Sequence, residues 1–395
     1  MHRRDGRRLD PRFLRRRQGM SAPRNAEYTK LYNKKTFLRL LRRTPLSRAD
    51  AARALGLSRA AASLIAEELI REGLVMETPV SAMVRSGRPP IALSVSPDAA
   101  YAVGVYLNRD GCTAGVVSLS GEVISRARFR LEAEGKTDAL CRSLSKLIEA
   151  SGVEREKLLG VGISAPGPLD SARGVILNPP QFSLWHGTAI GAEVEEKMAL
   201  PTLVENNAAS LASYYIGKPD AKGSESFLLL LVDSGVGSGL VLKNKLFYGA
   251  GSDTGELGHV TVKHDGRMCA CGNRGCLEAY AAIPALLTGS RFASWADVMN
   301  ERLLAEDARD LFEEETEYLA SAVVSTVNLL GIDTVLLAGD LRYEGEATAK
   351  RMEETVKARL LRKEDKPFSV LPVHSDENTG LSAAAEIVFE NYLRI

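Results

Sequence analysis

The chain has 395 residues, of which 45% are hydrophobic, 26% charged and 6% aromatic. This length predicts two or three domains, and the composition excludes a disordered chain, a collagen-like repeat and a disulfide-stapled miniprotein. The net charge of +1 is unevenly distributed along the chain. Residues 1–95 hold 21 Lys and Arg against 8 Asp and Glu, a net charge of +13, and the remaining residues have a net charge of −12. A basic N-terminal region followed by an acidic remainder indicates that the N-terminal region binds a polyanion.

Residues 1–24 are rich in arginine and lack a steady hydrophobic period, so we expect a basic disordered arm. Residues 25–97 predict an α+β winged helix-turn-helix domain, whose size is typical of DNA-binding modules. Serine caps and glycine stops delimit its helices, and two apolar stretches flank a loop that carries Arg88. The expected elements are a helix that ends before Pro45, helices at 48–55 and 59–72 capped by Ser47 and Ser58, and strands at 74–77 and 91–95.

Residues 98–395 alternate strands and helices, which predicts an α/β domain. Three consecutive strands, a helix and a further strand occur first at 101–164, and a comparable pattern follows at 227–337. Such a duplication predicts two lobes with a cleft between them, where small ligands commonly bind.

Three of the five cysteines, Cys269, Cys271 and Cys276, lie within eight positions, and His259 precedes them by ten. Three thiolates and one imidazole complete a closed tetrahedral zinc shell, which is the structural type of site. The alternative is three reduced cysteines in an ordinary loop. An odd cysteine count indicates a reducing compartment, and no apolar run approaches the ~20 residues of a membrane span, so we expect a cytoplasmic protein.

The same segment carries a family resemblance. Gly255-Glu-Leu-Gly-His259, followed by Cys269-Ala-Cys-Gly-Asn-Arg-Gly-Cys276-Leu-Glu278, resembles the signature of the ROK family of sugar kinases, open reading frames and repressors. The resemblance covers about residues 98–395 and includes Ala165-Pro-Gly-Pro-Leu-Asp170 and Ser234-Gly-Val-Gly-Ser-Gly239. It implies an actin-like (ribonuclease H-like), two-lobed ATPase fold that binds sugar between its lobes. The N-terminal module resembles the winged helix of the family's repressor branch.

The resemblance also implies the sugar contacts, and a ring of hydroxyls is well held by such carboxylates and amides. The implied contacts are Asn206, Asn207, Glu256, His259 and Glu278. His259 would bind zinc through one ring nitrogen and face the ligand or a further acceptor with the other. Position 209 departs from the family, because Ala209 stands where many members have asparagine, and this leaves the identity of the sugar open.

Two departures concern phosphoryl transfer. Kinase members carry at position 207 an aspartate that takes the proton from the attacking hydroxyl, but here it is Asn207, and an amide cannot serve as general base. The glycine-rich phosphate turn after the first strand is also absent, and we expect Tyr106 and Leu107 to place bulk where phosphates would sit. Both departures predict a body that binds sugar without phosphorylating it.

In the N-terminal module, the second helix of the helix-turn-helix is expected to enter the major groove. That expectation places Ser58, Arg59, Ala60 and Ser63 near bases and phosphates. The small side chains of Ala60–Ala62 would let this face of the helix approach the DNA closely. Arg88, in the loop between the two strands, is expected to reach into a minor groove. Protein contact is the alternative use of such a wing.

These inferences predict a sugar-responsive transcriptional regulator, a repressor that binds a palindromic double-stranded DNA operator as a homodimer or tetramer. A monosaccharide or sugar derivative is the expected effector, and structural Zn²⁺ the expected cofactor. One alternative is an active ATP-dependent sugar kinase that also binds DNA. Another is a DNA-binding protein whose body is a dimerisation scaffold without a ligand.

Overall fold

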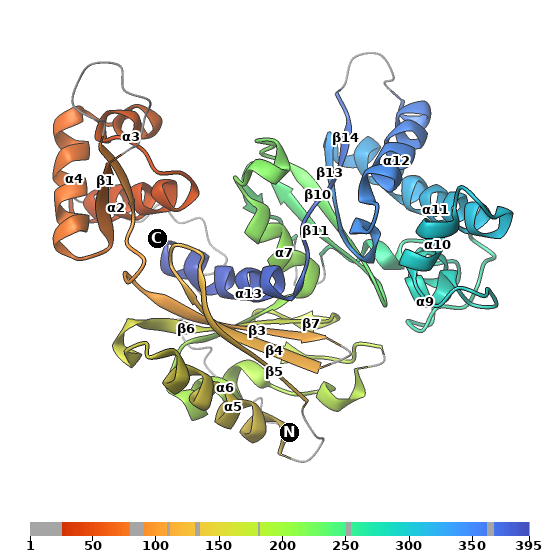
Figure 1. The fold of residues 1–395 in the computed structure, drawn as a ribbon, viewed down its shortest axis with the longest axis horizontal. Helices are drawn as coiled ribbons and strands as arrows, with labels where there is room; N and C mark the ends of the chain where they lie inside the picture. The colour runs from red at the N-terminus through yellow and green to blue at the C-terminus, as the bar shows by residue number, and fades with distance from the viewer. Residues whose placement is uncertain are drawn as a thin grey trace, which may run out of the picture. The chain divides into compact units, whose positions relative to one another are not determined.

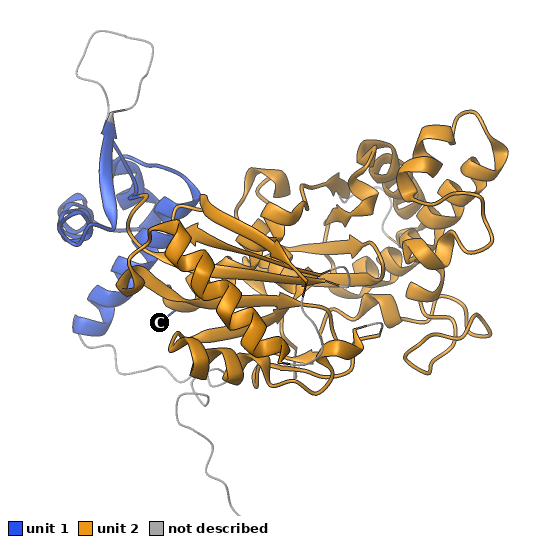
Figure 2. Ribbon diagram, turned by 60° about the horizontal axis from the view of Figure 1, so that its bottom comes forward, with its two compact units in different colours: residues 1–96, 393–395 blue, residues 97–392 orange. Residues whose placement is uncertain are grey.

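A computed structural model of the protein describes residues 26–79, 91–108, 111–130, 135–180, 182–249, 254–361 and 367–394. These residues form two compact units (Figure 2). Unit 1 comprises Met1–Ser96 together with Leu393–Ile395, and unit 2 comprises Pro97–Tyr392. The predicted arm at 1–24 and the loop with Arg88 lie outside the described residues.

Unit 1 is a three-helix module with a two-stranded antiparallel sheet. Its core contains Phe37 and Leu69, which are both almost fully buried. Leu46 adds a bridge to Leu93 beside the two strands, through hydrogen bonds of 3.1 and 2.8 Å between their backbones. The elements are α2 (Ala26–Arg43), α3 (Arg48–Leu55), α4 (Arg59–Arg71), β1 (Val75–Pro79) and β2 (Ile91–Val95).

The helix boundaries in unit 1 follow from local capping. The Ser47 hydroxyl accepts a hydrogen bond from the Asp50 backbone N–H, and the Ser58 hydroxyl accepts one from Ala61. Gly56 ends α3 with φ = 64°, a left-handed conformation that glycine adopts without a steric penalty. These local signals explain why the sequence predicts the turn between α3 and α4.

Residues 393–394 also belong to unit 1. Leu393 is 1% exposed, and the backbone carbonyl of Arg394 accepts a hydrogen bond of 2.8 Å from the Lys35 ammonium in α2. These two residues directly follow α13 (Glu377–Tyr392), the last helix of unit 2. Unit 1 is therefore assembled from two distant stretches of sequence.

Unit 2 contains two five-stranded sheets with the same strand order (Figure 1). In each sheet the first three strands form an antiparallel meander, and two parallel strands extend it from the first strand. The predicted duplication is therefore present at the level of topology. The first sheet has the order β5 (Val123–Phe129), β4 (Gly111–Ser118), β3 (Tyr101–Asn108), β6 (Leu158–Ala165), β9 (Thr202–Asn206). The second has β12 (Lys245–Leu246), β11 (Val236–Leu242), β10 (Phe227–Val232), β13 (Thr334–Gly339), β14 (Ser369–Pro372).

Alternate residues of the central strand β10 serve two cores. Leu228 and Leu230 pack in the same cluster as α11 (Glu306–Leu330) and α12 (Gly345–Arg359). Leu229 faces the opposite way, toward α7 (Asn207–Tyr215). Because successive strand residues point to opposite faces, an unbroken apolar run is what a sheet covered on both sides requires.

On the first sheet, α13 approaches the backbone closely. A Cβ added to Gly104 would lie 2.2 Å from the Leu381 carbonyl oxygen, and one added to Gly162 would lie 1.9 Å from that of Ala384. Glycine at these positions is what lets the helix lie directly on β3 and β6.

The remaining elements of unit 2 complete its layers and loops. They are α5 (Lys136–Ser151), α6 (Ile190–Met198), α8 (Glu278–Ala281), α9 (Ile283–Leu286), α10 (Trp295–Glu301), the short strands β7 (Leu169–Asp170) and β8 (Val175–Ile176), and the 3₁₀ turns at 155–157, 183–185, 219–221, 257–259 and 340–342. Within the described part of the chain, no helix is long and apolar enough to cross a membrane.

Candidate functional site

The five residues expected to contact sugar all line one cleft in unit 2. The cleft is open to solvent. Its polar lining comes from segments next to both sheets, because Asn206 ends β9 and Asn207 begins α7, whereas the others follow β11 in the chain. The five lining residues are Asn206, Asn207, Glu256, His259 and Glu278.

Asn206 is held at the junction of β9 and α7. It caps α7, since its side-chain oxygen accepts hydrogen bonds from the backbone N–H groups of Ala208 (2.8 Å) and Ala209 (3.4 Å). A Cβ added to Gly167 would lie 2.7 Å from the Asn206 Nδ2 atom and 3.3 Å from the Glu256 Oε1 atom. Gly167 therefore leaves room for an amide and a carboxylate to approach each other at the cleft.

Both ends of the Asn207 amide are engaged by the protein. Its oxygen accepts a hydrogen bond of 2.7 Å from the Ser164 hydroxyl, and its nitrogen donates one of 3.1 Å to the Leu107 carbonyl. Ser164 also lies 2.7 Å from the Ser210 hydroxyl, in a buried pair. Sequence reasoning missed Ser164 and Ser210, because residues more than forty positions apart carry no local signal of this contact.

The side chains of Tyr106 and Leu107 lie on opposite sides of β3. Tyr106 lines the cleft, and its ring packs against Gly380 of α13, where an added Cβ would lie 3.0 Å from ring carbons. Leu107, in contrast, is 1% exposed and belongs to the core of the first sheet, so its side chain cannot obstruct the cleft. The error is one of strand geometry, because adjacent residues on β3 must face opposite sides.

Glu278 links the cleft wall to the glycine hairpin between β10 and β11. Its Oε2 atom accepts a hydrogen bond of 3.0 Å from the Val236 backbone N–H. An added Cβ at Gly258 would lie 2.2 Å from the Val236 carbonyl oxygen, so the segment before the cysteines also lies against this hairpin. The two connections fix the carboxylates at positions 256 and 278 on the same wall.

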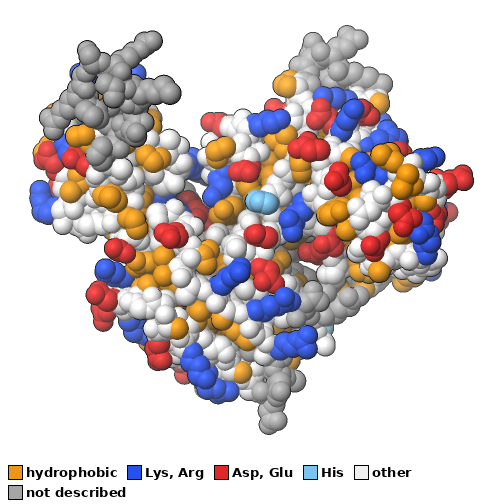
Figure 3. Space-filling view, viewed as in Figure 1, with side chains coloured by type: hydrophobic (Ala, Val, Ile, Leu, Met, Phe, Trp, Pro, Cys, Tyr) orange, Lys and Arg blue, Asp and Glu red, His pale blue; other side chains and the backbone are white. Residues whose placement is uncertain are grey.

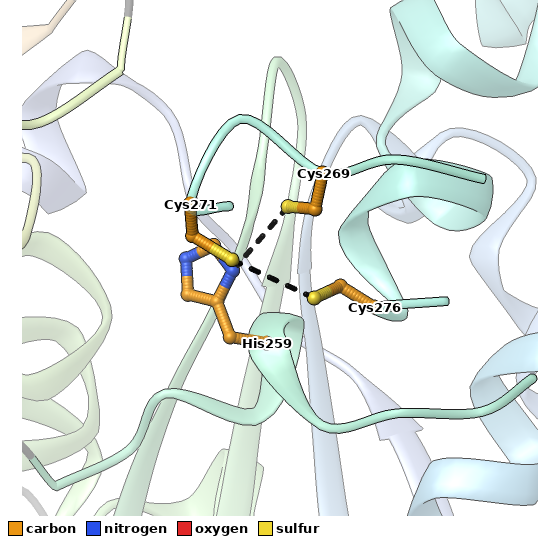
Figure 4. Close-up of side chains that lie close together, drawn as sticks. All are labelled: His259, Cys269, Cys271 and Cys276. Carbon is orange, nitrogen blue, oxygen red and sulfur yellow. Dashed lines mark hydrogen bonds between the residues drawn. The ribbon is translucent and has the colours of Figure 1, made fainter. Parts of the chain in front are cut away.

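The predicted metal ligands converge (Figure 4). The four ligand atoms of His259, Cys269, Cys271 and Cys276 lie within 4.8 Å of one another. The Cys271 and Cys276 sulfurs are 3.7 Å apart, and the His259 Nδ1 atom is 3.7 Å from the Cys269 sulfur. A tetrahedron with metal–sulfur bonds of about 2.3 Å has edges of about 3.8 Å, so the donor set fits a zinc ion.

The protonation of the thiols depends on their surroundings. Burial raises the pKa of Cys276 to about 12 and also raises the pKa of Cys269. The backbone N–H of Asn273 lowers the pKa of the more exposed Cys271. Buried thiols become thiolates when a cation replaces their protons, so metal binding at this cluster is coupled to proton release.

The loop between the ligands is folded by its glycines. Gly275 has φ = 71°, and an added Cβ would lie 1.6 Å from the Lys263 carbonyl oxygen. Asn273 donates from its side chain to the Cys276 sulfur at 3.4 Å. These contacts within the loop hold the cysteines close together independently of a bound ion.

His259 joins the cysteine cluster to the cleft. Its Nδ1 atom faces Cys269, and its Nε2 atom lies 4.0 Å from the Glu256 Oε2 atom. This is the division of the two ring nitrogens that the sequence analysis expects. A metal on Nδ1 would fix the ring and, through it, the neighbouring carboxylate.

In unit 1, the predicted DNA contacts lie at the start of α4. Ser58, Arg59 and Ala60 are exposed and Ser63 is half-buried, so all four are at or near the surface. Ala62 is fully buried in the core and does not belong to the small face predicted for DNA. The inward stripe of α4 includes this position, which explains the difference.

One exposed apolar side chain on α4 was missed. Leu64 is 63% exposed and follows Ser63 directly. A single apolar residue on a helix surface is common, and only its place on the second helix of the helix-turn-helix gives it interest.

The surface of the described residues in the view of Figure 3 carries both charge signs, interspersed rather than separated. Unit 1 contains exposed ion pairs, such as Arg48 with Glu67 at 3.3 Å and with Glu77 at 2.9 Å. Exposed pairs of this kind contribute little to stability.

Comparison with known proteins decides the family. The sequence profile described as the ROK family matches residues 102–391, nearly all of unit 2. The chain belongs to the ROK family.

ROK relatives differ in how much of the chain they match. The xylose repressor of Bacillus subtilis (strain 168) is 26% identical over 377 residues, which is 93% of this chain and 97% of the relative. The glucokinase of Thermotoga maritima is 27% identical over 311 residues, which is 73% of this chain and 97% of the relative. The similarity to the repressor thus extends into unit 1.

A solved ROK structure has the same fold. It is a transcriptional regulator described as a homologue of the Escherichia coli MLC protein, with a TM-score of 0.75, 21% identity and coverage of 92% of this chain and 98% of that one. Together with the profile match, it confirms the expected actin-like, two-lobed body behind an N-terminal helical module.

Proposed function

We propose that this ROK protein is a sugar-responsive, DNA-binding transcriptional regulator, a repressor of carbohydrate-utilisation genes that acts in the cytoplasm. Unit 2 binds a monosaccharide or sugar derivative in the cleft and does not phosphorylate it. Unit 1 binds a double-stranded DNA operator, as part of a homodimer or of a pair of dimers.

The observation that carries this proposal is the pair of hydrogen bonds made by the Asn207 side chain. A residue at that point of the cleft would have to accept the hydroxyl proton of a sugar that attacks ATP. An amide whose oxygen already accepts from Ser164 and whose nitrogen donates to Leu107 cannot do so. Tyr106, beside it on β3, replaces the open glycine turn of a phosphate site. The cleft therefore binds a sugar but does not support transfer of a phosphoryl group to it.

The DNA-binding part of the proposal rests on unit 1 and on the extent of similarity. The alignment with the xylose repressor leaves too few residues uncovered to omit unit 1. Arg59 and Ala60 lie exposed at the N-terminus of α4, where a recognition helix meets bases. The exposure of these residues at the start of α4 supports the proposal of an operator contact there.

Zinc is proposed as a structural cofactor. His259, Cys269, Cys271 and Cys276 would hold it with no open position for substrate. Bound there, zinc would supply rigidity rather than Lewis acidity, because Glu256 and Glu278 extend from the two ends of the segment that it clamps. The sugar would then meet a preorganised wall.

Operator binding with and without sugar tests the function. We expect one or more monosaccharides to change operator affinity by about 5–150-fold, the range that a coupling of about 1–3 kcal/mol produces. Titration of fluorescent operator DNA with the zinc-loaded protein gives the size and the direction of this change. A protein that binds no operator selected from random DNA would contradict the proposal.

The kinase alternative is favoured by kinase relatives, of which the glucokinase of Thermotoga maritima is one. A coupled assay with a hexose panel, ATP and magnesium separates the two functions. Turnover above about 1 s⁻¹, an ordinary kinase rate, would establish the kinase instead. The scaffold alternative is separated by a thermal-shift screen, in which a zinc-loaded protein that responds to no sugar has no effector site.

A further inference from the structure

The first two turns of α4 present few hydrogen-bonding side chains at their surface. Three residues of the segment 59–66 are buried in unit 1, and the other five are exposed or half-buried. Among these five, Arg59 and Ser63 have side chains that can make hydrogen bonds. The remaining three are apolar, and they are Ala60, Ala61 and Leu64. This part of the helix therefore has little capacity to recognise bases through hydrogen bonds.

Leu64 is the largest apolar side chain at this surface, and it is 63% exposed. Ala61 and Ala60 precede it by three and four residues, a spacing that places all three side chains on one face of the helix. The two alanines are too small to cover the leucine. Leu64 is thus available to a group that approaches α4 from outside.

The acidic residues of α4 near Leu64 are paired with cations of unit 1. Glu67, which follows Leu64 by three residues, lies 3.3 Å from Arg48 of α3, and Glu68 lies 2.6 Å from Lys30 of α2. Residues 1–95 as a whole hold 21 Lys and Arg against 8 Asp and Glu. These charges favour a polyanion beside this helix.

The small size of the apolar surface favours DNA over a protein partner. A stable protein interface buries about 800 Å² on each partner, and one leucine with two alanines supplies only a small part of that area. The major groove of B-DNA exposes a single kind of apolar group, the C5 methyl of thymine, among hydrogen-bonding base edges. One leucine side chain is large enough to cover such a methyl group, and the neighbouring alanines let the helix approach it closely.

We propose that Leu64 is a specificity-determining residue for the operator, and that it contacts the C5 methyl group of a thymine in each half-site. The inference rests on the proposed function, since it names a feature of the operator DNA that α4 recognises. At that base pair the protein distinguishes thymine from other bases by an apolar contact rather than by hydrogen bonds.

Replacement of single thymines by deoxyuridine tests the assignment, because uracil keeps the base-pairing groups of thymine and lacks its methyl group. The operator is first selected from random DNA with the full-length, zinc-loaded protein. Fluorescence anisotropy then measures the affinity of the protein for each substituted operator. We expect replacement at one position of each half-site to weaken binding by about fourfold for each methyl group removed.

One variant and a matched control locate the contact. Leu64→Ala should remove the sensitivity to uracil at that position and leave the sensitivity at any other position unchanged. Leu304→Ala makes the same substitution in unit 2, at an 84% exposed position before α11, and should retain both the affinity and the uracil sensitivity of the wild type. Thermal unfolding of each variant confirms that it is folded.

The outcomes separate this inference from the proposed function. If an operator binds but no uracil replacement weakens its binding, Leu64 does not contact a thymine methyl group, and the regulator stands. A Leu64→Ala variant that responds to uracil as the wild type does also overturns the assignment, and a changed sedimentation coefficient in that variant would show a protein contact instead. If no operator can be selected, the proposed function fails, and the inference fails with it.

Discussion

The amide at position 207 makes two hydrogen bonds that an ionised carboxylate could not both make. Its nitrogen donates to the Leu107 carbonyl, and only a donor can occupy that position at 3.1 Å. An aspartate would place a carboxylate oxygen against a carbonyl oxygen unless it remained protonated. The backbone around position 207 thus fits an asparagine side chain. We therefore expect that replacing its amide nitrogen with oxygen, as in aspartate, does not create a general base.

Asn207→Asp is accordingly expected to lack sugar kinase turnover and to lower the free energy of unfolding by about 0.5–1.5 kcal/mol, the net contribution of a hydrogen bond lost at a half-buried position. The coupled assay and urea unfolding measure the two effects. Asn207→Ala serves as the comparison, because it removes both hydrogen bonds without adding an acid. An Asp variant as stable as the wild type would contradict the contact with Leu107.

A second residue of interest is Glu315, fully buried on α11. Neither of its carboxyl oxygens has a hydrogen-bond partner among the described residues. Burial raises its pKa well above the ordinary value, so the carboxyl is protonated in the folded protein where the unfolded chain has already lost the proton. Stability must therefore fall as the pH rises above the ordinary pKa of glutamate and continue to fall until the folded pKa is reached.

Glu315→Gln removes this titration. We expect the variant to match the wild type near pH 4 and to exceed it at pH 8 by at least about 1 kcal/mol, since one pKa unit corresponds to about 1.4 kcal/mol. Urea unfolding at several pH values measures the difference. Glu196→Gln, at an exposed position of α6, is the control and should leave the slope unchanged. Parallel curves for wild type and Glu315→Gln would rule out the raised pKa.

At the scale of elements, the cysteine loop between η4 (Leu257–His259) and α8 is the structural support of the cleft. It has little regular structure, and its folding depends on tight turns and on the four side chains that converge. A metal ion bound there would add to the order of the loop. The two carboxylates at positions 256 and 278 flank it, so such an ion would also steady their geometry.

Cys271→Ser should lose stoichiometric zinc and lower the melting temperature of unit 2 by several degrees, because the remaining ligands leave the shell open. Native mass spectrometry or metal analysis measures occupancy, and calorimetry measures melting. Cys141→Ser, which exchanges a thiol away from the cluster, should keep its zinc. Full occupancy in Cys271→Ser would show that the shell is assigned wrongly.

The sequence predicts these elements well where the signal is local. The caps Ser47 and Ser58 and the ligand spacing around Cys271 act within a few residues, and the structure places them as expected. The prediction for Leu107 was wrong because the face of the sheet on which a side chain lies alternates from one strand residue to the next. The sequence could not predict that Ala209 and Phe247 line one pocket, since this follows from the packing of α7 beside β12.

At the scale of the whole molecule, charge is divided along the chain, with a net of +13 in residues 1–95. A protein that displaces counterions from DNA binds less tightly as salt increases, in proportion to its phosphate contacts. The operator affinity of this chain should therefore fall steeply between about 50 and 200 mM salt.

Arg59→Ala should weaken operator binding and leave the sugar affinity of unit 2 unchanged, because it removes an exposed cation from the start of α4. Fluorescence anisotropy and calorimetry measure the two affinities. Arg53→Ala removes an exposed arginine from α3 and is the matched control. If both variants lose affinity to the same extent, α4 does not read the operator.

The burial of Leu393 in unit 1 has a consequence for biosynthesis. Residues 393–394 leave the ribosome only after all of residues 97–392, yet the compact unit that begins the chain incorporates them. Unit 1 thus reaches its full set of contacts only once unit 2 has been synthesised, so a nascent chain does not hold a completed unit 1 before unit 2 has been made.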